Sequence, residues 1–150
     1  MISRKSSQRS GRRILIAVVD AAPLYAAADE EDANHERSLE TLERGDLELV
    51  FPALVIAEAT CLIGRRLGSF AEARFLGDLE NHEVEAPTAA DWRRIAELVE
   101  RYADFPLGGT DASVVALAER LDTDLVITLD RRRFAAVRPR HCDAFTLLPE

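Results

Sequence analysis

Short apolar segments alternate with longer segments of helical periodicity along this chain. The clearest strand candidate is the unbroken apolar run at residues 14–19, which is rich in branched side chains and is followed by Asp20. Because both faces of this run are apolar, it is typical of a parallel strand that is buried on both sides. A second short run with buried-strand character, Leu125-Val126-Ile127-Thr128-Leu129, is followed directly by Asp130.

The same two periodicities predict the remaining elements. Strands are expected at residues 14–19, 47–51, 82–85, 124–128 and, at a sheet edge, 145–148, and helices at 33–43, 52–67, 69–80, 88–102, 110–121 and, as a single turn, 131–134. Pro52 is typical of a first helical residue, and Ser69 with Glu72 forms a capping box. Strands that alternate with helices favour a mostly parallel sheet covered on both faces. Residues 14–150 are therefore expected to form one α/β domain, preceded by a flexible basic leader at residues 1–13.

The charge of the chain is distributed unevenly. The 150 residues carry 27 acids and 19 bases, a net charge of −8, and only one of the bases is a lysine. Residues 1–13 and 131–142 each hold five bases and no acid, which leaves residues 14–130 with 25 acids and 9 arginines, a net charge of −16. Such acidity excludes a general nucleic-acid coat, which needs a broad basic footprint. It leaves open RNA binding through a local basic patch or through metal ions.

Hydropathy predicts a cytoplasmic protein that does not associate with a membrane. No apolar run reaches the roughly 18 residues that span a bilayer, and the six-residue run before Asp20 falls short of a secretory signal's apolar region of about 7–15 residues. Cys61 and Cys142 do not suggest a disulfide framework. Cys61 lies within an apolar run and is expected to be a small core residue.

Two aspartates follow buried strands. Asp20 comes directly after the first strand, and Asp130 has the same placement after the strand at residues 124–128. In open parallel sheets, ligands bind beyond the carboxyl ends of the strands, so both aspartates are candidates for a functional site. The alternative is that each one only caps the helix that follows it.

Glu58 is surrounded by apolar residues. Its neighbours at the helical spacings of three and four are Val55, Cys61, Leu54 and Leu62, so its side chain is expected to point inward or to the edge of the apolar stripe. A buried carboxylate is prohibitively unfavourable unless it is protonated, paired or bound to a metal. An internal salt bridge to an arginine is the alternative explanation.

Asp111 begins the helix at residues 110–121, directly after a pair of glycines and Thr110. By itself it is explained as a helix-capping residue. Together with Asp20, Glu58 and Asp130, however, it completes a set of four acids that a parallel sheet can bring to one edge. Adjacent carboxylates raise one another's pKa values, and a divalent cation removes that conflict. All-oxygen ligation is typical of Mg²⁺ or Mn²⁺ rather than zinc, and such sites activate water for displacement at a phosphodiester.

Four stretches that contain these acids resemble the PIN-domain nucleases, and most closely the VapC-type toxins of bacterial toxin–antitoxin pairs. The stretches are Val18-Val19-Asp20, Val55-Ile56-Ala57-Glu58, Gly109-Thr110-Asp111-Ala112-Ser113-Val114-Val115-Ala116-Leu117-Ala118 and Thr128-Leu129-Asp130-Arg131-Arg132-Arg133-Phe134. Their order and spacing agree with the family from residue 14 to the C-terminus, and the last two stretches are the most specific.

The resemblance implies a three-layer α/β/α domain that forms a homodimer and is blocked by an antitoxin protein. It also implies a Mg²⁺- or Mn²⁺-dependent endoribonuclease in which the four acids are both metal ligands and catalytic residues, with Thr128 and Thr110 as supporting polar residues. Ala22 departs from the pattern, because the family often has serine, threonine or asparagine there. The arginines at residues 131–133 could contact RNA phosphates; alternatively they form a solvated helix turn or compensate the acidic surface.

The sequence lacks the residues that other α/β enzyme classes require. Haloacid-dehalogenase-like phosphatases and response-regulator receivers also place an aspartate after the first strand, but both need a late lysine, and the only lysine here is Lys5. The chain has neither a Walker phosphate loop nor a G-x-G-x-x-G motif. The remaining alternative is a catalytically inactive PIN-fold protein that acts by binding or regulation, which metal-dependent turnover would distinguish.

Overall fold

A five-stranded parallel sheet forms the centre of the protein. The computed structural model describes residue 11 and residues 13–150, so most of the leader predicted at residues 1–13 lies outside the described residues. The strands are β1 (Leu15–Val19), β2 (Leu47–Pro52), β3 (Glu83–Glu85), β4 (Leu125–Ile127) and β5 (Thr146–Leu148). They are ordered β3-β2-β1-β4-β5, and every pair is parallel. The sheet predicted to be mostly parallel is thus parallel throughout its described strands.

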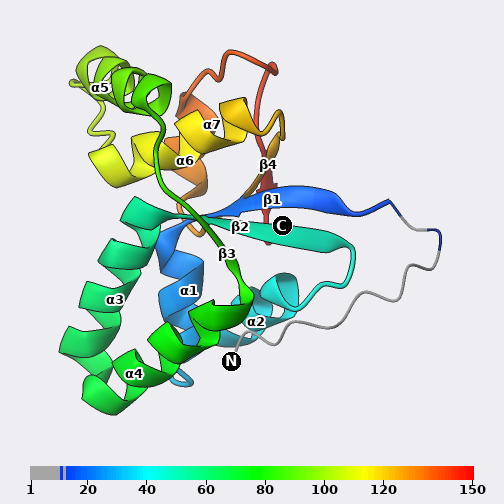
Figure 1. The fold of residues 1–150 in the computed structure, drawn as a ribbon, viewed down its shortest axis with the longest axis vertical. Helices are drawn as coiled ribbons and strands as arrows, with labels where there is room; N and C mark the ends of the chain where they lie inside the picture. The colour runs from blue at the N-terminus through cyan, green and yellow to red at the C-terminus, as the bar shows by residue number, and fades with distance from the viewer. Residues whose placement is uncertain (1–10, 12) are drawn as a thin grey trace.

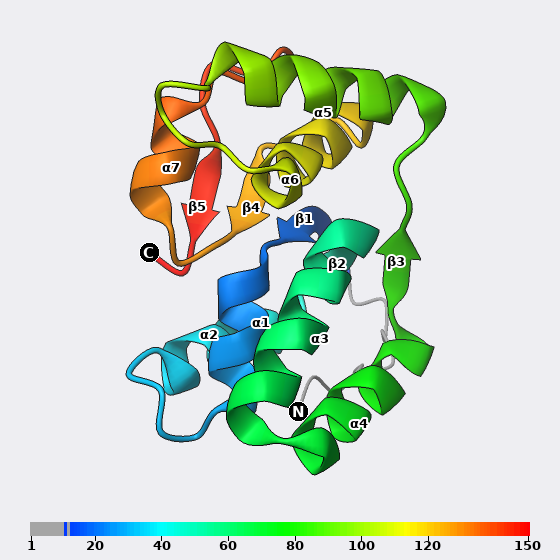
Figure 2. The ribbon, with the colours of Figure 1, turned by 90° about the vertical axis from the view of Figure 1, so that its left-hand side faces the viewer.

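Helices cover the sheet on both faces, as the sequence predicts. They are α1 (Ala21–Ala28), α2 (His35–Leu42), α3 (Ala53–Leu67), α4 (Ser69–Asp78), α5 (Ala89–Arg101), α6 (Gly109–Arg120) and α7 (Arg131–Ala136), with a 3₁₀ turn, η1, at Leu79–Asn81. Figures 1 and 2 show α1 to α4 on one side of the sheet and α5 to α7 on the other. The predicted three-layer α/β/α architecture is confirmed.

The strand order places a ligand-binding position between β1 and β4. From β1 the chain proceeds to β2 and β3 on one side, and then crosses to β4 and β5 on the other. The crevice beyond the carboxyl ends of such a strand pair is where open α/β sheets bind ligands. In the β1–β4 register, Val19 lies opposite Ile127, so the next residues along, Asp20 and Thr128, are brought together beyond the strand ends.

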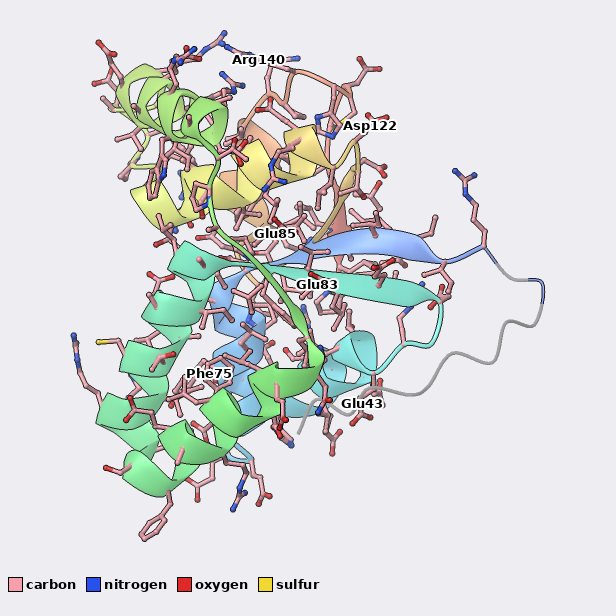
Figure 3. The ribbon with its side chains drawn as sticks, in the orientation of Figure 1. Glu43, Phe75, Glu83, Glu85, Asp122 and Arg140 are labelled. Atoms are coloured by element: carbon pink, nitrogen blue, oxygen red, sulfur yellow. The ribbon has the colours of Figure 1, made fainter. Side chains whose placement is uncertain are left out.

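The hydrophobic core lies on both faces of the sheet and holds the strand ends in place. Val18, Val19, Val126 and Ile127 are fully buried between the two helical layers. Helix α6 is buried along residues 111–118, because it is enclosed between the sheet and α5, and this accounts for its lack of a polar face. On the opposite side, the buried Phe75 of α4 lies within the layer that α4 forms with α3 (Figure 3).

Two sequence predictions about local structure were wrong, and one helix was expected only as an alternative. Helix α1 follows Asp20, where a helix was considered only as the reason for a capping aspartate; Pro23 is its third residue, where proline is compatible with a first turn. The predicted Ser69 capping box is absent, because Gly68, with a φ of +90°, precedes α4 and Ser69 is already helical. Cys61 is exposed on α3 instead of buried.

No helix in the described part of the chain is both long enough and apolar enough to cross a membrane.

Candidate functional site

Asp20 lies at the carboxyl end of β1 and is almost completely buried, with 5% of its surface exposed. Its Oδ1 accepts a hydrogen bond from the Ala21 backbone N–H (2.8 Å), and its Oδ2 accepts one from the Thr128 hydroxyl (2.8 Å). Both carboxylate oxygens therefore have a fixed donor. The predicted capping alternative for Asp20 is also present, since it precedes α1 directly.

Thr128 connects the two strand ends. Its hydroxyl donates to Asp20 and accepts a hydrogen bond from the Asp130 backbone N–H (3.0 Å), and the side chain is fully buried. Ala22 cannot take part in this network, because its side chain has no donor. Thr128 is consequently the side chain that orients the Asp20 carboxylate within the described residues.

Neighbouring acids and burial raise the pKa of Asp20. The resulting pKa is about 6, and loss of solvent around the carboxyl group is the largest cause of the increase. The hydrogen bonds from Thr128 and Ala21 oppose the increase, and the negative charges of Asp111 and Glu58 contribute to it. Three of the four predicted acids thus interact electrostatically at the same place.

Asp111 lies in the first turn of α6, and its side chain is buried. Its Oδ2 accepts a hydrogen bond from the Gly108 backbone N–H (3.1 Å). The residue therefore does cap the helix, as the structural alternative predicted, but its carboxylate also interacts with Asp20 and Glu58. A capping role and a site role are both compatible with this geometry.

Glu58 lies at the edge of the buried stripe of α3. It is exposed, while the buried stripe of that helix consists of Val55, Ala59 and Ile63. Of the two predicted orientations, the inward one was therefore wrong and the edge of the stripe agrees with the structure; no internal salt bridge to Glu58 is present among the described residues. Partial desolvation and the charge of Asp111 raise the pKa of Glu58, whereas the charge of Arg133 lowers it. Glu58 thus faces the other acids from the solvent side.

Asp130 caps α7 and contacts Arg133. Its Oδ1 accepts a hydrogen bond from the Arg133 backbone N–H (3.0 Å), and its Oδ2 lies 3.3 Å from Arg133 Nε. Arg133 Nη1 lies 3.2 and 3.1 Å from Oδ1 and Oδ2 of Asp111. One guanidinium group therefore joins two of the four acids.

The four acids supply ligand atoms that fit Mg²⁺ or Mn²⁺, because all are carboxylates and such hard cations prefer oxygen ligands. Burial is the largest cause of the raised pKa values of Asp20 and Glu58, and the neighbouring negative charges add to it; a cation would relieve that repulsion. With Arg133 between Asp111 and Asp130, no group of three His, Cys, Asp or Glu side chains in the described residues is arranged to hold a metal ion.

The other predicted site residues have different surroundings. Arg131 Nη1 donates to the backbone carbonyls of Leu147 (3.3 Å) and Pro149 (2.7 Å), which fastens α7 to the C-terminal strand. Arg132 is exposed. The Thr110 hydroxyl makes no hydrogen bond within residues 13–150, although the Thr110 carbonyl accepts one from Ser113.

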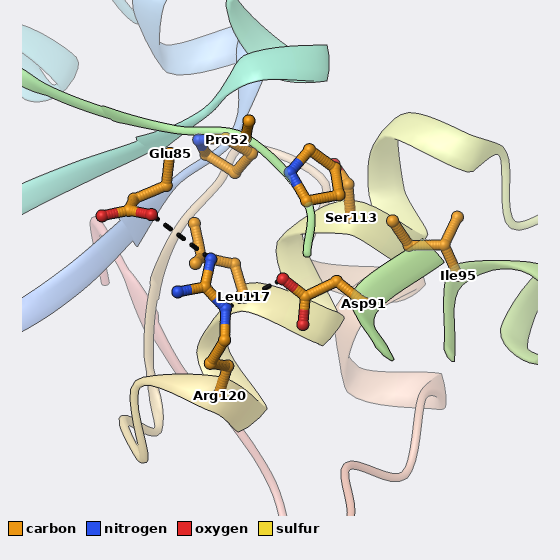
Figure 4. A pocket seen from close by; sticks show the side chains of 9 residues that line it. Pro52, Glu85, Asp91, Ile95, Ser113, Leu117 and Arg120 are labelled. Carbon is orange, nitrogen blue, oxygen red and sulfur yellow. Dashed lines mark hydrogen bonds and ion pairs between the residues drawn. The ribbon is translucent and has the colours of Figure 1, made fainter. Parts of the chain in front are cut away.

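A separate small pocket lies between β3, α5 and α6 (Figure 4). Its one basic group, Arg120, is already paired with Asp91 (2.8 Å) and Glu85 (3.3 Å). None of the four predicted acids lines this pocket. The acids beyond β1 and β4 are therefore the better candidate site.

Comparisons with known proteins identify the family of the chain. The PIN domain family model matches residues 17–138. The chain is 34% identical over 134 residues to "Ribonuclease VapC26" of Mycobacterium tuberculosis. The aligned region covers 88% of this chain and 99% of that protein.

Solved structures share the fold. The crystal structure of the Mycobacterium tuberculosis VapC20, described as a "Sarcin-Ricin loop cleaving toxin", matches 80% of this chain and 94% of its own with a TM-score of 0.74 at 20% identity. VapBC2 of Rickettsia felis, bound to a DNA fragment from their promoter, matches 79% of this chain and 92% of its own with a TM-score of 0.59 at 15% identity. The sequence and structural matches together show that the chain belongs to the PIN-domain family, alongside the VapC proteins.

Proposed function

We propose that the chain is an endoribonuclease that hydrolyses RNA phosphodiester bonds with Mg²⁺ or Mn²⁺, and that it is the toxin of a toxin–antitoxin pair. The observation that carries this proposal is the meeting of Asp20, Asp111 and Glu58 beyond the β1 strand end, where the charges of Asp111 and Glu58 contribute to the raised pKa of Asp20 and the charge of Asp111 contributes to that of Glu58. The similarity to a protein named as a ribonuclease, over most of both chains, supports the same reaction.

Asp20, Glu58, Asp111 and Asp130 would hold the cation. When bound, a divalent cation lowers the pKa of water and offsets the charge of the phosphodiester. The chain contributes a rigid arrangement of oxygens. Thr128 and Ala21 fix the Asp20 carboxylate, and the Gly108 N–H fixes that of Asp111, so little reorganisation is needed when charge develops in the reaction.

Contact with the RNA backbone would come from the arginines of α7. Arg132 is exposed and makes no ion pair among the described residues, so its guanidinium is available for phosphate, whose geometry arginine matches. Arg131 is less suited to this role, since it already donates to two backbone carbonyls. The phosphate contact predicted for the arginines at residues 131–133 therefore rests mainly on Arg132, and on Arg133 where it is released from the acids.

Partners follow from the same proposal. We propose that a second copy of the chain and a cognate antitoxin protein bind it. The similarity to VapBC2, whose structure contains a DNA fragment from their promoter, supports a partner that binds DNA. Co-expression with the product of the neighbouring gene, followed by size-exclusion chromatography, tests both.

Metal dependence is tested with the purified chain. We expect cleavage of a single-stranded RNA in millimolar Mn²⁺ and none in EDTA, together with a Mn²⁺-dependent rise in melting temperature, because a ligand that binds only the folded state stabilises it. A binding-only PIN-fold protein would leave the RNA intact under both conditions. A melting temperature unmoved by Mn²⁺ would contradict a site formed by the folded chain.

Glu58→Gln should lower cleavage without lowering stability. Glu58 is exposed and makes no ion pair in the described part of the chain, so the free energy of unfolding should change by less than about 0.5 kcal/mol. The cleavage rate should fall by about tenfold to a hundredfold, as is typical when the surroundings of a bound metal lose a carboxylate. Glu40 is an exposed acid on α2, and Glu40→Gln serves as the control; equal rates in the two variants would exclude Glu58 from the site.

A further inference from the structure

Arg133 is the only cation in contact with the acids of the site among the described residues. Its guanidinium lies 3.1 Å from Asp111 Oδ2 and 3.3 Å from Asp130 Oδ2. Burial by itself would lower the pKa of Arg133, but Asp111, Asp130 and Asp20 outweigh this effect and raise it. The same positive charge lowers the pKa of Glu58. Arg133 therefore interacts electrostatically with all four acids.

The position of Arg133 conflicts with the use of the acids as metal ligands. A carboxylate oxygen that accepts a short charge-assisted hydrogen bond from a guanidinium presents fewer free lone pairs to a cation. Asp111 is contacted at both of its oxygens. Arginine remains charged throughout the physiological pH range, so a change of pH does not release it.

A divalent cation can, however, displace the Arg133 guanidinium from the acids. The side chains of Arg133 and Asp130 are 37% and 38% exposed, whereas that of Asp111 is 12% exposed. Partly exposed ion pairs contribute little net stability, so a divalent cation with several carboxylate ligands can replace one. The Arg133 backbone would stay in place, because its N–H caps α7 by donating to Asp130.

We propose that Arg133 is an internal counter-ion of the site, which neutralises Asp111 and Asp130 when no metal is bound and competes directly with a divalent cation for them. This inference rests on the proposed function, since it concerns the same four acids. The positive charge of Arg133 reduces the repulsion between the acids in the metal-free protein. Metal binding then requires the Arg133 guanidinium to move away from Asp111.

Mn²⁺ binding without RNA tests this proposal. We expect Arg133→Gln to bind Mn²⁺ roughly fivefold more tightly than the unmodified protein in isothermal titration calorimetry, because the variant lacks the two ion pairs with which the cation competes, and partly exposed ion pairs are weak. Arg132→Gln is the matched control. It removes the same formal charge from the preceding residue, and Arg132 makes no ion pair in the described residues. Arg133→Lys, which keeps the charge but not the planar fork, should lie between the two.

A second measurement distinguishes competition from a purely structural role. In EDTA, Arg133→Gln should melt at a lower temperature than Arg132→Gln, and saturating Mn²⁺ should remove that difference. Equal Mn²⁺ affinities of Arg133→Gln and Arg132→Gln would overturn the proposal while leaving the metal-dependent function intact. If neither variant nor the unmodified protein bound Mn²⁺, the metal-dependent function itself would fail, and the counter-ion role with it.

Discussion

Exchange of Asp111 for asparagine is expected to reduce RNA cleavage by at least about a hundredfold, because it removes one of the four proposed metal ligands. The fold should persist. An asparagine side-chain oxygen can still accept the hydrogen bond from Gly108 that Asp111 accepts. The lost ion pair with Arg133 is partly exposed, and such pairs contribute about 1 kcal/mol or less.

The measurement is the initial rate of cleavage in saturating Mn²⁺, with circular dichroism as the check on folding. Asp104→Asn provides the matched control, since Asp104 is an exposed acid that lies outside the site. A folded Asp111→Asn protein that cleaves RNA as fast as the control would show that the site is elsewhere.

Exchange of Asp20 for asparagine is expected to stabilise the metal-free protein at neutral pH. The pKa of Asp20 rises from 3.8 to about 6 on folding, and at about 1.4 kcal/mol per pKa unit this corresponds to a penalty of about 3 kcal/mol for the ionised form. The variant loses the hydrogen bond that Thr128 donates to Asp20 Oδ2, which costs about 1 kcal/mol. The net gain at pH 7 should therefore be about 2 kcal/mol.

This gain should depend on pH with a defined sign. The folded protein holds the Asp20 proton more tightly than the unfolded chain does, so the folded state binds more protons between pH 3.8 and about 6. Stability of the unmodified protein therefore falls as the pH rises through this window, and the fall is absent in Asp20→Asn. Urea unfolding in EDTA at pH 4, 5, 6 and 7 would measure the difference. A difference that stayed constant over this range would contradict the raised pKa of Asp20.

Asp20→Asn should also be inactive, so the same substitution raises stability and removes function. Proteins commonly retain such unfavourable groups at sites that carry out chemistry. In saturating Mn²⁺ the order of stability should reverse, because only the unmodified protein retains the full set of carboxylates for the cation.

The strand-end acids could be predicted because they depend on buried strands alone. The runs before Asp20 and Asp130 are apolar on both faces, and this property identifies central parallel strands whatever the rest of the chain does. The register of β1 and β4 then places Thr128 beside Asp20. The family resemblance included Thr128, but its contact with Asp20 could not be derived from either segment separately.

The orientation of Glu58 could not be predicted for a physical reason. Helix α3 is apolar on more than one face, so Leu54 and Leu62 looked as suitable for the core as Val55 and Ala59. The structure buries the second pair and leaves Glu58 and Cys61 exposed. When the polar face of a helix is narrow, the hydrophobic periodicity does not determine which stripe faces the sheet.

Of the two carboxylate contacts of Arg133, only the one with Asp130 could be predicted from the sequence. Its spacing of three residues from Asp130 indicates a contact within one helical turn. Its contact with Asp111 joins residues 22 positions apart and depends on the way α6 and α7 pack on the same side of the sheet (Figure 2). The sequence therefore suggested a phosphate contact for this arginine, whereas the structure shows that its partners are carboxylates.

The hydrogen bond from Thr128 to Asp20 joins residues 108 positions apart, and this separation has a consequence for protein synthesis. The first strand is made early, but Asp20 receives its orienting partner only after β4 has been synthesised and has added to β1. Asp111 and Asp130 are also made late. A growing chain on the ribosome therefore cannot assemble the four acids until most of it has been translated, so a protein of this kind would not cut RNA while it is still being made.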